Sequence, residues 1–513
     1  MPAGQTKKVT VGPVSWIVPN SLWWPNIPYV EGYRAQLHNL DVTATVVGSE
    51  PSTSHVRFGF REIEQVGDGF ELNGVPINFR GDSPQGADYD NIDNYGRGDA
   101  FDTLPGFLRP SASNPGWEKV IDNYQRLNYN SVRIHQEPAS PYMLDVADEM
   151  GMILMDESAI RGSNGRESLF SGRDNMVKHV QDLVLRDRNH ASVLRWSQAN
   201  EPTTGTQSPF PAPGYSIGFD RELYKAVMAL DDTRPISTDG NSPDLDYDNY
   251  TVYCHYWDVS WSNPDRFTES TCPEAVLPGK PHGSGEHIWN TDNTPRGFMQ
   301  FATSTQRMRV NDAADIRPYT LLSAWASLVP GVRSTDMTIE GNLKPLYGED
   351  NLPDPWSHPT VQRIQKAFSP LLVSDNAYWD ANKRSNSAGV WPAVPVALER
   401  GASVTRTLTV FNDLLNTDNV TLNWAVRSGS ATGDIVASGS KDLFIPRGSD
   451  KDHEITFTVP KSADDLYLVL SAQTAANGTV FTDDGTKFAT VEPAPGDNTA
   501  LRGQSPFIKV ERR

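Results

Sequence analysis

The strongest constraint on the fold is an alternation of short apolar strands with amphipathic helices. Eight strand-like runs occur in the middle of the chain, at 74–81, 130–136, 152–157, 192–201, 234–240, 250–256, 279–286 and 321–326. Between them, apolar residues recur at helical spacing, as in Trp117, Val120, Ile121 and Tyr124. This alternation is typical of a parallel sheet with crossover helices. Eight such units predict a closed (β/α)8 TIM barrel, with an open doubly wound sheet as the structural alternative.

Both flanks of the barrel segment have strand character without helical spacing. Residues 1–68 carry alternating apolar positions that include Leu40 and Val42, which predict part of a β-sandwich. After residue 370, strand-like runs return between Gly, Asp and Pro turns, at 404–413, 420–426, 453–459, 465–472 and 487–491. We therefore expect an N-terminal partial sandwich over 1–68, a barrel over 69–370 and a C-terminal β-sandwich over 371–513.

The charge and hydropathy of the chain exclude two classes of partner. The 45 Lys and Arg face 64 Asp and Glu, so the formal net charge is −19, and a field of this sign repels phosphate backbones. No stretch approaches the ~18 apolar residues that a membrane span needs. We expect neither nucleic acid nor a membrane as partner, whereas a homo-oligomer stays open.

The cysteines and the first residues bear on the cellular compartment. Cys254 and Cys272 are too few for a disulfide framework or a Cys-rich zinc site, although one bridge between them stays possible. The first residues hold two lysines and no apolar segment after them, so no secretory signal is visible. The localisation is open on this basis, and the periplasm or the exterior is favoured only if an upstream segment is missing.

Several predicted strands end in reactive side chains, where the active-site groups of a TIM barrel are found. The fourth strand ends in Asn200 and Glu201, the seventh in Glu286 and the third in Asp156 and Glu157. Two carboxyl groups across a barrel mouth suit glycoside hydrolysis, in which one protonates the departing oxygen and the other attacks the anomeric carbon. Asn200 would supply an amide for the sugar 2-hydroxyl. In the structural alternative, Glu201 caps a helix and Glu286 is a solvated loop acid.

Six runs of the chain strongly resemble glycoside hydrolase family 2, the group of β-galactosidases, β-glucuronidases and β-mannosidases. They are FGFREIE, FELNGVPINFRG, NSVRIHQEP, LDVADEMGMILMDES, LRDRNHASVLRWSQANEP and KPHGSGE. The resemblance implies that Glu201 is the general acid/base and Glu286 the nucleophile. It also implies a jelly-roll domain and an immunoglobulin-like sandwich ahead of the barrel. We expect the jelly roll to be missing and the sandwich to be partial.

The same resemblance implies contacts to the sugar or the nucleophile at further positions. Arg133 and His135 would orient the nucleophile, and their alternative is a structural ion pair and a core imidazole. Glu157 matches an acid of the third strand and could instead pair with Arg133 or Arg80. Asp82 lies where sugar contacts are usual, and a turn-capping role competes with that assignment.

Two aromatic assignments complete the implied sugar-binding residues. One of Tyr253, His255 and Tyr256 would lie at the place of a tyrosine that donates to the nucleophile. Trp325, at the end of the eighth predicted strand, resembles the tryptophan that floors the −1 sugar subsite, although a lone Trp is normally core.

One departure from the family pattern bears on metals. Magnesium-using members carry a Glu-x-His pair shortly after the Asp-Glu of the third strand, whereas this chain has Arg161 and Ser163 there. A guanidinium cannot ligate a cation, so we expect no metal and no cofactor.

These expectations describe a retaining, exo-acting β-glycosidase of β-galactosidase type that removes terminal β-linked sugars from oligo- or polysaccharides. A β-mannosidase, a β-glucuronidase or an enzyme for a modified galactoside would keep the mechanism and change the sugar. A catalytically silent carbohydrate-binding protein is the alternative from another class. The presence of both Glu201 and Glu286 argues against it.

Overall fold

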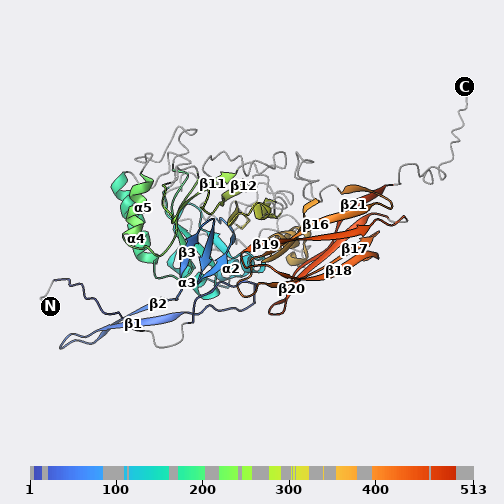
Figure 1. The fold of residues 1–513 in the computed structure, drawn as a ribbon. Coiled ribbons are helices and arrows are strands. Elements are labelled where there is room, and N and C mark those ends of the chain that lie inside the picture. The colour runs from blue at the N-terminus through green and yellow to red at the C-terminus, as the bar shows by residue number, and fades with distance from the viewer. Residues whose placement is uncertain are drawn as a thin grey trace, which may run out of the picture.

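A computed structural model of the chain has a central barrel, N-terminal strands on one side and a C-terminal β region on the other (Figure 1). The described residues are 5–13, 15, 21–84, 109–112, 115–160, 172–202, 219–240, 245–256, 277–289, 302, 304–306, 308–319, 321–322, 339, 354–377, 395–461 and 464–492.

Eight parallel strands close into the barrel. They are β6 (Phe79–Asp82), β7 (Ser131–Arg133), β8 (Ile153–Glu157), β9 (Val193–Asn200), β10 (Ile236–Asp239), β11 (Tyr250–Tyr256), β12 (Gly283–Trp289) and β13 (Asp315–Tyr319). The last strand, β13, pairs with the first, β6, so the sheet has no free edge. The predicted barrel is confirmed, and the open sheet is excluded.

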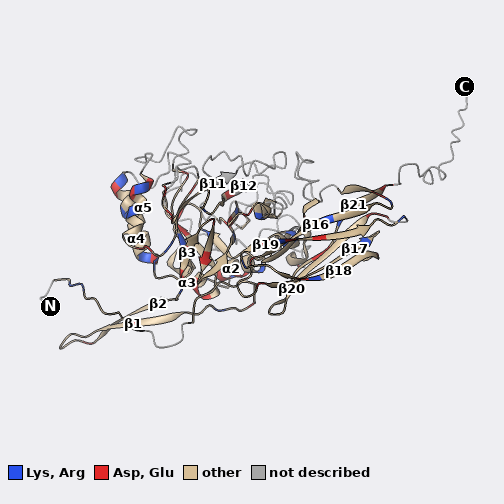
Figure 2. Ribbon diagram, viewed as in Figure 1, with Lys and Arg blue, Asp and Glu red and all other residues tan. Residues whose placement is uncertain are grey.

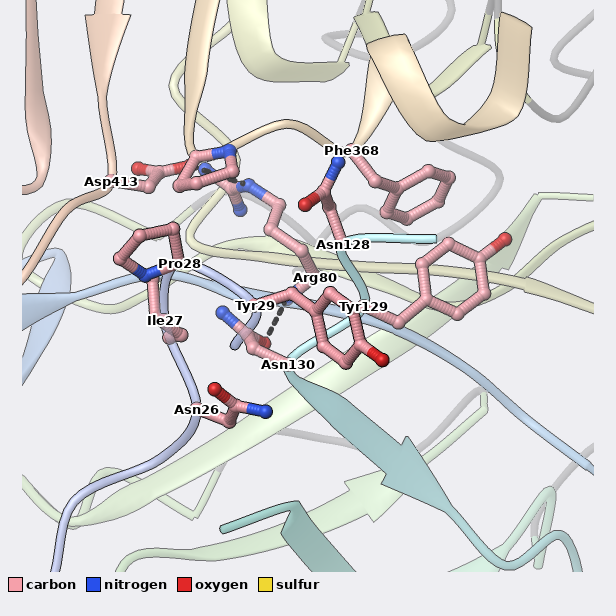
Figure 3. A pocket seen from close by; sticks show the side chains of 11 residues that line it. Asn26, Ile27, Pro28, Tyr29, Arg80, Asn128, Tyr129, Asn130, Phe368 and Asp413 are labelled. Carbon is pink, nitrogen blue, oxygen red and sulfur yellow. Dashed lines mark hydrogen bonds and ion pairs between the residues drawn. The ribbon is translucent and has the colours of Figure 1, made fainter. Parts of the chain in front are cut away.

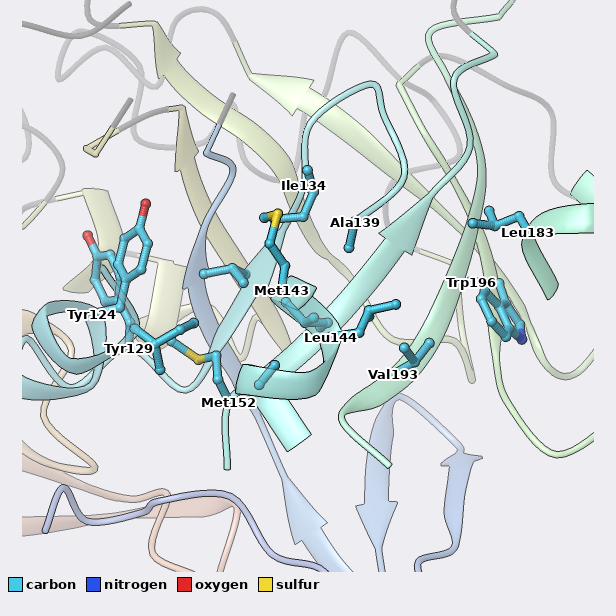
Figure 4. Close-up of a cluster of buried hydrophobic side chains, with 14 of the residues drawn as sticks. Tyr124, Tyr129, Ile134, Ala139, Met143, Leu144, Met152, Leu183, Val193 and Trp196 are labelled. Carbon is cyan, nitrogen blue, oxygen red and sulfur yellow. The ribbon is translucent and has the colours of Figure 1, made fainter. Parts of the chain in front are cut away.

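Helices follow the early barrel strands where the apolar spacing predicts them. They are α2 (Gly116–Arg126), α3 (Pro141–Met150), α4 (Arg173–Asp187) and α5 (Asp220–Met228), and α8 (Pro359–Ala367) follows a short helix, η6 (Pro355–Ser357). The chain enters α3 through Ser140, whose hydroxyl accepts from the Met143 N–H, and leaves it through Gly151 at φ 67°. The apolar faces pack on the strands in one core, in which Tyr124, Met143 and Trp196 are buried (Figure 4).

Two predicted barrel strands are wrong in position. The first is divided, because β5 (Val75–Ile77) belongs to another sheet and the barrel strand is β6. The eighth is β13, which ends before the predicted run at 321–326 begins. Its sequence, DIRPY, was missed because two charged residues and a proline interrupt the apolar pattern used to recognise strands.

The predicted N-terminal sandwich is a two-stranded antiparallel sheet in the described residues. Its strands are β1 (His38–Ala44) and β2 (Ser52–Phe58). The side chains of Leu40 and Val42 are 53% and 52% exposed, so the alternation marks a strand but not a buried face. This corrects the expectation for that segment.

A three-stranded antiparallel sheet precedes the barrel. It consists of β3 (Ile63–Val66), β4 (Gly69–Leu72) and β5, and therefore spans the predicted domain boundary after residue 68. Phe70 and Ile77 of this sheet share a core with Trp23 and with Phe79 of the barrel.

Two sheets form the C-terminal β region. One contains β14 (Leu371–Asp375), β16 (Ser403–Asn412) and β19 (Ser449–Thr458). The other contains β15 (Val396–Glu399), β21 (Gly478–Glu492), β20 (Leu466–Thr474), β17 (Asn419–Ser428) and β18 (Asp434–Phe444). Leu408 and Phe457 of the first sheet share one core with Leu422 and Leu468 of the second, as in a sandwich.

A buried charge cluster joins this β region to the barrel (Figure 3). Asp413, which follows β16, accepts hydrogen bonds from Asn78 Nδ2 at 2.7 Å and Arg80 Nε at 3.1 Å. Arg309 Nη2 lies 3.1 Å from the same carboxylate. Burial acts to raise the pKa of Asp413, but the two guanidinium groups outweigh it and lower that pKa. Arg80 and Asp413 also line a cavity of about 10 Å³.

We expect Asp413→Asn to lower the free energy of unfolding by about 3 kcal/mol, since it leaves two buried guanidinium groups without their counter-charge. Asp418→Asn is the matched control, because the ion pair of Asp418 with Arg447 is half-buried and should be worth at most about 1 kcal/mol. Urea unfolding followed by tryptophan fluorescence measures both changes. Equal losses in the two variants would contradict a role of this cluster in joining the two regions.

No helix among the described residues is long and apolar enough to cross a membrane. Figure 2 shows acidic and basic residues interspersed along α4 and α5. These two helices therefore present no continuous basic stripe of the kind that binds a phosphate backbone.

Candidate active site

The two carboxyl groups predicted to do the chemistry lie on strands of the same barrel. Glu201 directly follows β9, and Glu286 lies within β12, which continues to Trp289 rather than ending at Glu286 as predicted. Both residues are buried, with 6% and 5% of their surface exposed. Because all eight strands are parallel, their C-terminal ends share one mouth.

Arg133, at the end of β7, contacts residues on both strands that carry the two acids. Its Nη2 donates to Asn200 Oδ1 at 2.5 Å, beside Glu201 in the chain. Its Nη1 donates to Gly285 O at 3.2 Å and lies 3.5 Å from Glu286 Oε1. The structure thus brings three of the predicted residues, Asn200, Glu286 and Glu157, to one guanidinium group, and Glu157 binds it in two places.

His135 lies within hydrogen-bond distance of Glu286. Its Nε2 lies 2.5 Å from Glu286 Oε1, and its ring centroid is 4.6 Å from that of Tyr319, at the end of β13. The imidazole therefore holds one carboxylate oxygen of Glu286 in place. Tyr319 was not predicted as part of the site, because strand β13 itself was misplaced.

Glu157 and Asp239 form ion pairs with the Arg133 guanidinium. Glu157 accepts from Arg133 Nε at 2.7 Å and Nη2 at 2.9 Å, and Asp239 Oδ1 lies 3.7 Å from Arg133 Nη1. The Ser197 hydroxyl contacts both carboxylates, at 2.6 Å from Glu157 and 2.8 Å from Asp239. The Glu157 pairing with Arg133 agrees with the salt-bridge alternative considered for that residue.

The pKa values of Glu157 and Asp239 are shifted in opposite directions. Burial acts to raise the pKa of Asp239, but Arg133, Arg195 and Arg317 lower it to about 2. Burial raises the pKa of Glu157, an effect that Arg133 opposes and the charge of Asp239 reinforces. Burial lowers the pKa of Arg133, but the surrounding carboxylates outweigh it and raise that pKa, so the guanidinium is a fixed positive charge.

Asn200 has one amide atom fixed and one free. Its Oδ1 accepts from Arg133, which leaves the Nδ2 group as a donor. That nitrogen is buried and has no hydrogen-bond partner among the described residues. A buried amide donor without a partner is costly unless an acceptor is supplied, and a sugar hydroxyl is one such acceptor.

Asp82, the last residue of β6, lies in a fully buried setting. Its carboxylate accepts from the Tyr124 hydroxyl at 2.7 Å and from the backbone N–H groups of Leu321 and Leu322 at 2.9 and 3.2 Å. These bonds tie β6 to the segment after β13, which agrees with the capping alternative. The sugar contact stays a prediction.

We expect Asp82 to make stability depend on pH. Burial raises its pKa from the ordinary 3.8 to about 6, although Tyr124 and the backbone donors oppose the shift. The folded state therefore binds the Asp82 proton more tightly than the unfolded state does. The contribution of this proton to the free energy of unfolding is complete below pH 3.8 and is lost as the pH rises through 6. Relative to Asp82→Asn, the wild-type free energy of unfolding should fall by ~3 kcal/mol over that interval. Urea unfolding at pH 3.5, 5 and 7 tests this, and a constant difference would contradict it.

The aromatic predictions fare differently. The Arg195 guanidinium lies 4.2 Å from the ring centroid of Tyr253, whose hydroxyl has no hydrogen-bond partner among the described residues. His255 pairs in register with Glu286 on the neighbouring strand, and Tyr256 pairs with His287. The side chains of His255 and Tyr256 lie outside the described part of the chain, as does Trp325. The eighth strand, β13, ends at Tyr319.

The described residues contain no group of three or more His, Cys, Asp and Glu that could hold a metal ion. Arg161 and Ser163, on which the expectation about magnesium depends, lie outside them, as does Cys272. The absence of a metal therefore stays a prediction, and a bridge between Cys254 and Cys272 stays open.

Sequence reasoning missed Ser197 and Asp239. Asp239 is the last residue of β10, so the strand-end rule that identified Glu201 could have identified it too. Ser197 carried no signal of its own, because its role depends on the two carboxylates that it connects.

Residues 116–316 match the family described as glycosyl hydrolases family 2, TIM barrel domain. This segment contains Arg133, Glu157, Asn200, Glu201 and Glu286. Among curated proteins, a β-glucuronidase from Rattus norvegicus is 29% identical over 249 residues, which are 47% of this chain and 34% of that protein. A β-galactosidase from Arthrobacter sp. (strain B7) is 30% identical over 200 residues, which are 37% of this chain and 18% of that protein. The matches thus span about a third or less of these relatives.

Among solved structures, a family 2 member from Bacteroides cellulosilyticus DSM 14838 has a TM-score of 0.46 and 16% identity, and covers 90% of this chain and 52% of its own. A β-D-glucuronidase from Dictyoglomus thermophilum has a TM-score of 0.47 and 18% identity, with 68% and 58% covered. The family match falls on the barrel that carries the two carboxyl groups and Arg133, so residues 116–316 are similar to the TIM barrel domain of glycosyl hydrolases family 2.

Proposed function

We propose that the barrel hydrolyses a terminal β-glycosidic bond by double displacement, with Glu286 as nucleophile and Glu201 as general acid/base. The observation that carries this proposal is the pair of contacts from Arg133 and His135 to Glu286 Oε1. Both contacts fix one carboxylate oxygen, and the Arg133 guanidinium places positive charge beside a group that must be negative to attack the anomeric carbon.

In the first step, Glu286 forms a bond to the anomeric carbon while Glu201 gives its proton to the departing oxygen. In the second step, Glu201 takes a proton from water, whose oxygen replaces Glu286 at that carbon. The free Nδ2 of Asn200 would donate to a sugar hydroxyl beside the reacting carbon. Each displacement inverts the anomeric carbon, so the product keeps the β configuration.

The sugar is the less constrained part of the proposal. A β-galactoside is our first expectation, and a β-glucuronide is the second candidate because the curated relatives include proteins named for each activity. A β-mannoside is a third candidate with the same mechanism. A silent carbohydrate-binding protein would bind these sugars without releasing them.

A panel of nitrophenyl β-glycosides that differ at C2, C4 and C5 tests the proposal. We expect one sugar to be hydrolysed with clear preference, and proton NMR should detect its β-anomer before mutarotation. Release of the α-anomer first would contradict double displacement. Binding of a sugar without release from any member of the panel would support the silent binding protein.

A further inference from the structure

The end of β10 packs directly against the backbone of Glu201. The Glu201 N–H donates to Asp239 O at 2.6 Å, and the next residue, Gly240, donates its N–H to Tyr253 O at 2.6 Å on β11. The Asp239–Gly240 dipeptide is therefore fixed on one side to β11 and on the other to the residue that follows β9.

Two residues at this contact have left-handed backbones. Glu201 has φ 45° and Gly240 has φ 96°. Glycine adopts such angles without cost, whereas a glutamate does so only where the surroundings impose it. The backbone of Glu201 is thus held in an unfavourable conformation by its neighbours, at the residue proposed as acid/base.

Gly240 leaves the space that this conformation needs. A Cβ atom at position 240 would lie 2.6 Å from Glu201 Cγ, 2.8 Å from its Cα and 2.9 Å from its N. Two of these three atoms belong to the Glu201 backbone, so rotation of the glutamate side chain cannot relieve the clash. The residue itself would have to move.

We propose that Gly240, together with the Asp239 carbonyl, is the positioning element that sets where the Glu201 carboxyl group lies. The inference rests on the proposed function for the role of Glu201, but the placement is a statement about geometry. The same dipeptide also reaches the other acid, because the Asp239 carboxylate lies 3.7 Å from Arg133, which contacts Glu286.

Gly240→Ala tests the proposal through the dependence of the rate on the leaving group. Misplacing a general acid by a fraction of an ångström to 1 Å should lower kcat/KM by about 10²-fold on alkyl glycosides, whose leaving group needs a proton. The loss on 2,4-dinitrophenyl glycosides should stay below about 5-fold, because that leaving group departs without one.

Gly401→Ala is the matched control. Gly401 has φ 80°, and a Cβ there meets no atom within 4 Å, so this variant carries the backbone cost of alanine without a contact. Its kcat/KM should equal that of the wild type on both substrates. An equal loss on both substrates in Gly240→Ala, or no loss beyond the control, would overturn the proposal.

Two measurements do not depend on activity. A crystal structure of Gly240→Ala should show the Glu201 backbone displaced, and an unmoved Glu201 would overturn the proposal. This readout holds even for an inactive wild type, since a lack of hydrolysis would reject only the proposed function. If Gly240→Ala does not fold, the double variant Glu201→Gly/Gly240→Ala should recover a cooperative thermal transition, because it removes Cγ and lets residue 201 adapt. No recovery would show that Gly240 is required for another reason.

Discussion

Replacing Glu286 by Gln should lower kcat/KM by about 10⁴-fold or more on every leaving group. The neutral amide cannot form the bond to the anomeric carbon, and this bond is made in the first step, so a better leaving group does not bypass the loss. The variant keeps the shape of the side chain next to Arg133 and His135. Initial rates on one alkyl and one dinitrophenyl glycoside of the preferred sugar measure the effect.

Glu64→Gln is the control for this change. Glu64 is exposed on β3, in a sheet outside the barrel, and the same chemical change there should leave both rates unaltered. A Glu286→Gln protein that folds and still cleaves the dinitrophenyl glycoside at a tenth of the wild-type rate would remove Glu286 from the nucleophile role.

The barrel could be predicted from sequence because most of its strands are apolar and its early helices have regular spacing. In α2, Trp117, Val120, Ile121 and Tyr124 lie at helical spacing, and all four are buried. Such patterns arise from local geometry, in which each element buries one face, and they need no knowledge of the partner.

Strand β13 could not be predicted in this way because the barrel interior is charged at its level. Arg195 Nη1 and Arg317 Nη2 each donate to Asp315 Oδ2 at 2.5 Å, and all three side chains are buried. These buried charges neutralise one another, since Asp315 pairs with Arg195 of β9 and with Arg317 of its own strand. Polar residues that pair across the barrel look like a loop when the sequence is read one segment at a time.

The residues of the candidate site likewise differ in whether the sequence could predict them. Glu201, Glu286 and Arg133 were predicted because they lie at or near strand ends and fit a known pattern. The role of Gly240 could not be, because it depends on an open space beside a residue 39 positions earlier in the chain. A glycine after a strand is ordinary, and only the geometry identifies what its missing side chain makes possible.

Glu201→Ala should produce a loss that depends on the leaving group, unlike the loss in Glu286→Gln. On alkyl glycosides, kcat/KM should fall by about 10²–10⁴-fold, because no proton reaches the departing oxygen. On 2,4-dinitrophenyl glycosides, kcat/KM should stay close to the wild-type value, since the first step needs no acid there.

The turnover number of Glu201→Ala on the activated substrate should nevertheless be low, because the second step lacks its general base and the glycosyl-enzyme accumulates. Azide needs no deprotonation and fits the space left by the side chain, so it should attack the anomeric carbon, release the Glu286 carboxylate and raise kcat. The product should be the β-glycosyl azide. A rise in rate that forms no glycosyl azide, or equal losses on both substrates, would place the acid/base on another residue.

The response to azide should also distinguish Glu201→Ala from Gly240→Ala. Both variants are expected to impair the first step, but Gly240→Ala keeps the carboxyl group that acts as base in the second step. Azide should therefore restore kcat in Glu201→Ala more than in Gly240→Ala, which separates removal of the carboxyl group from its displacement.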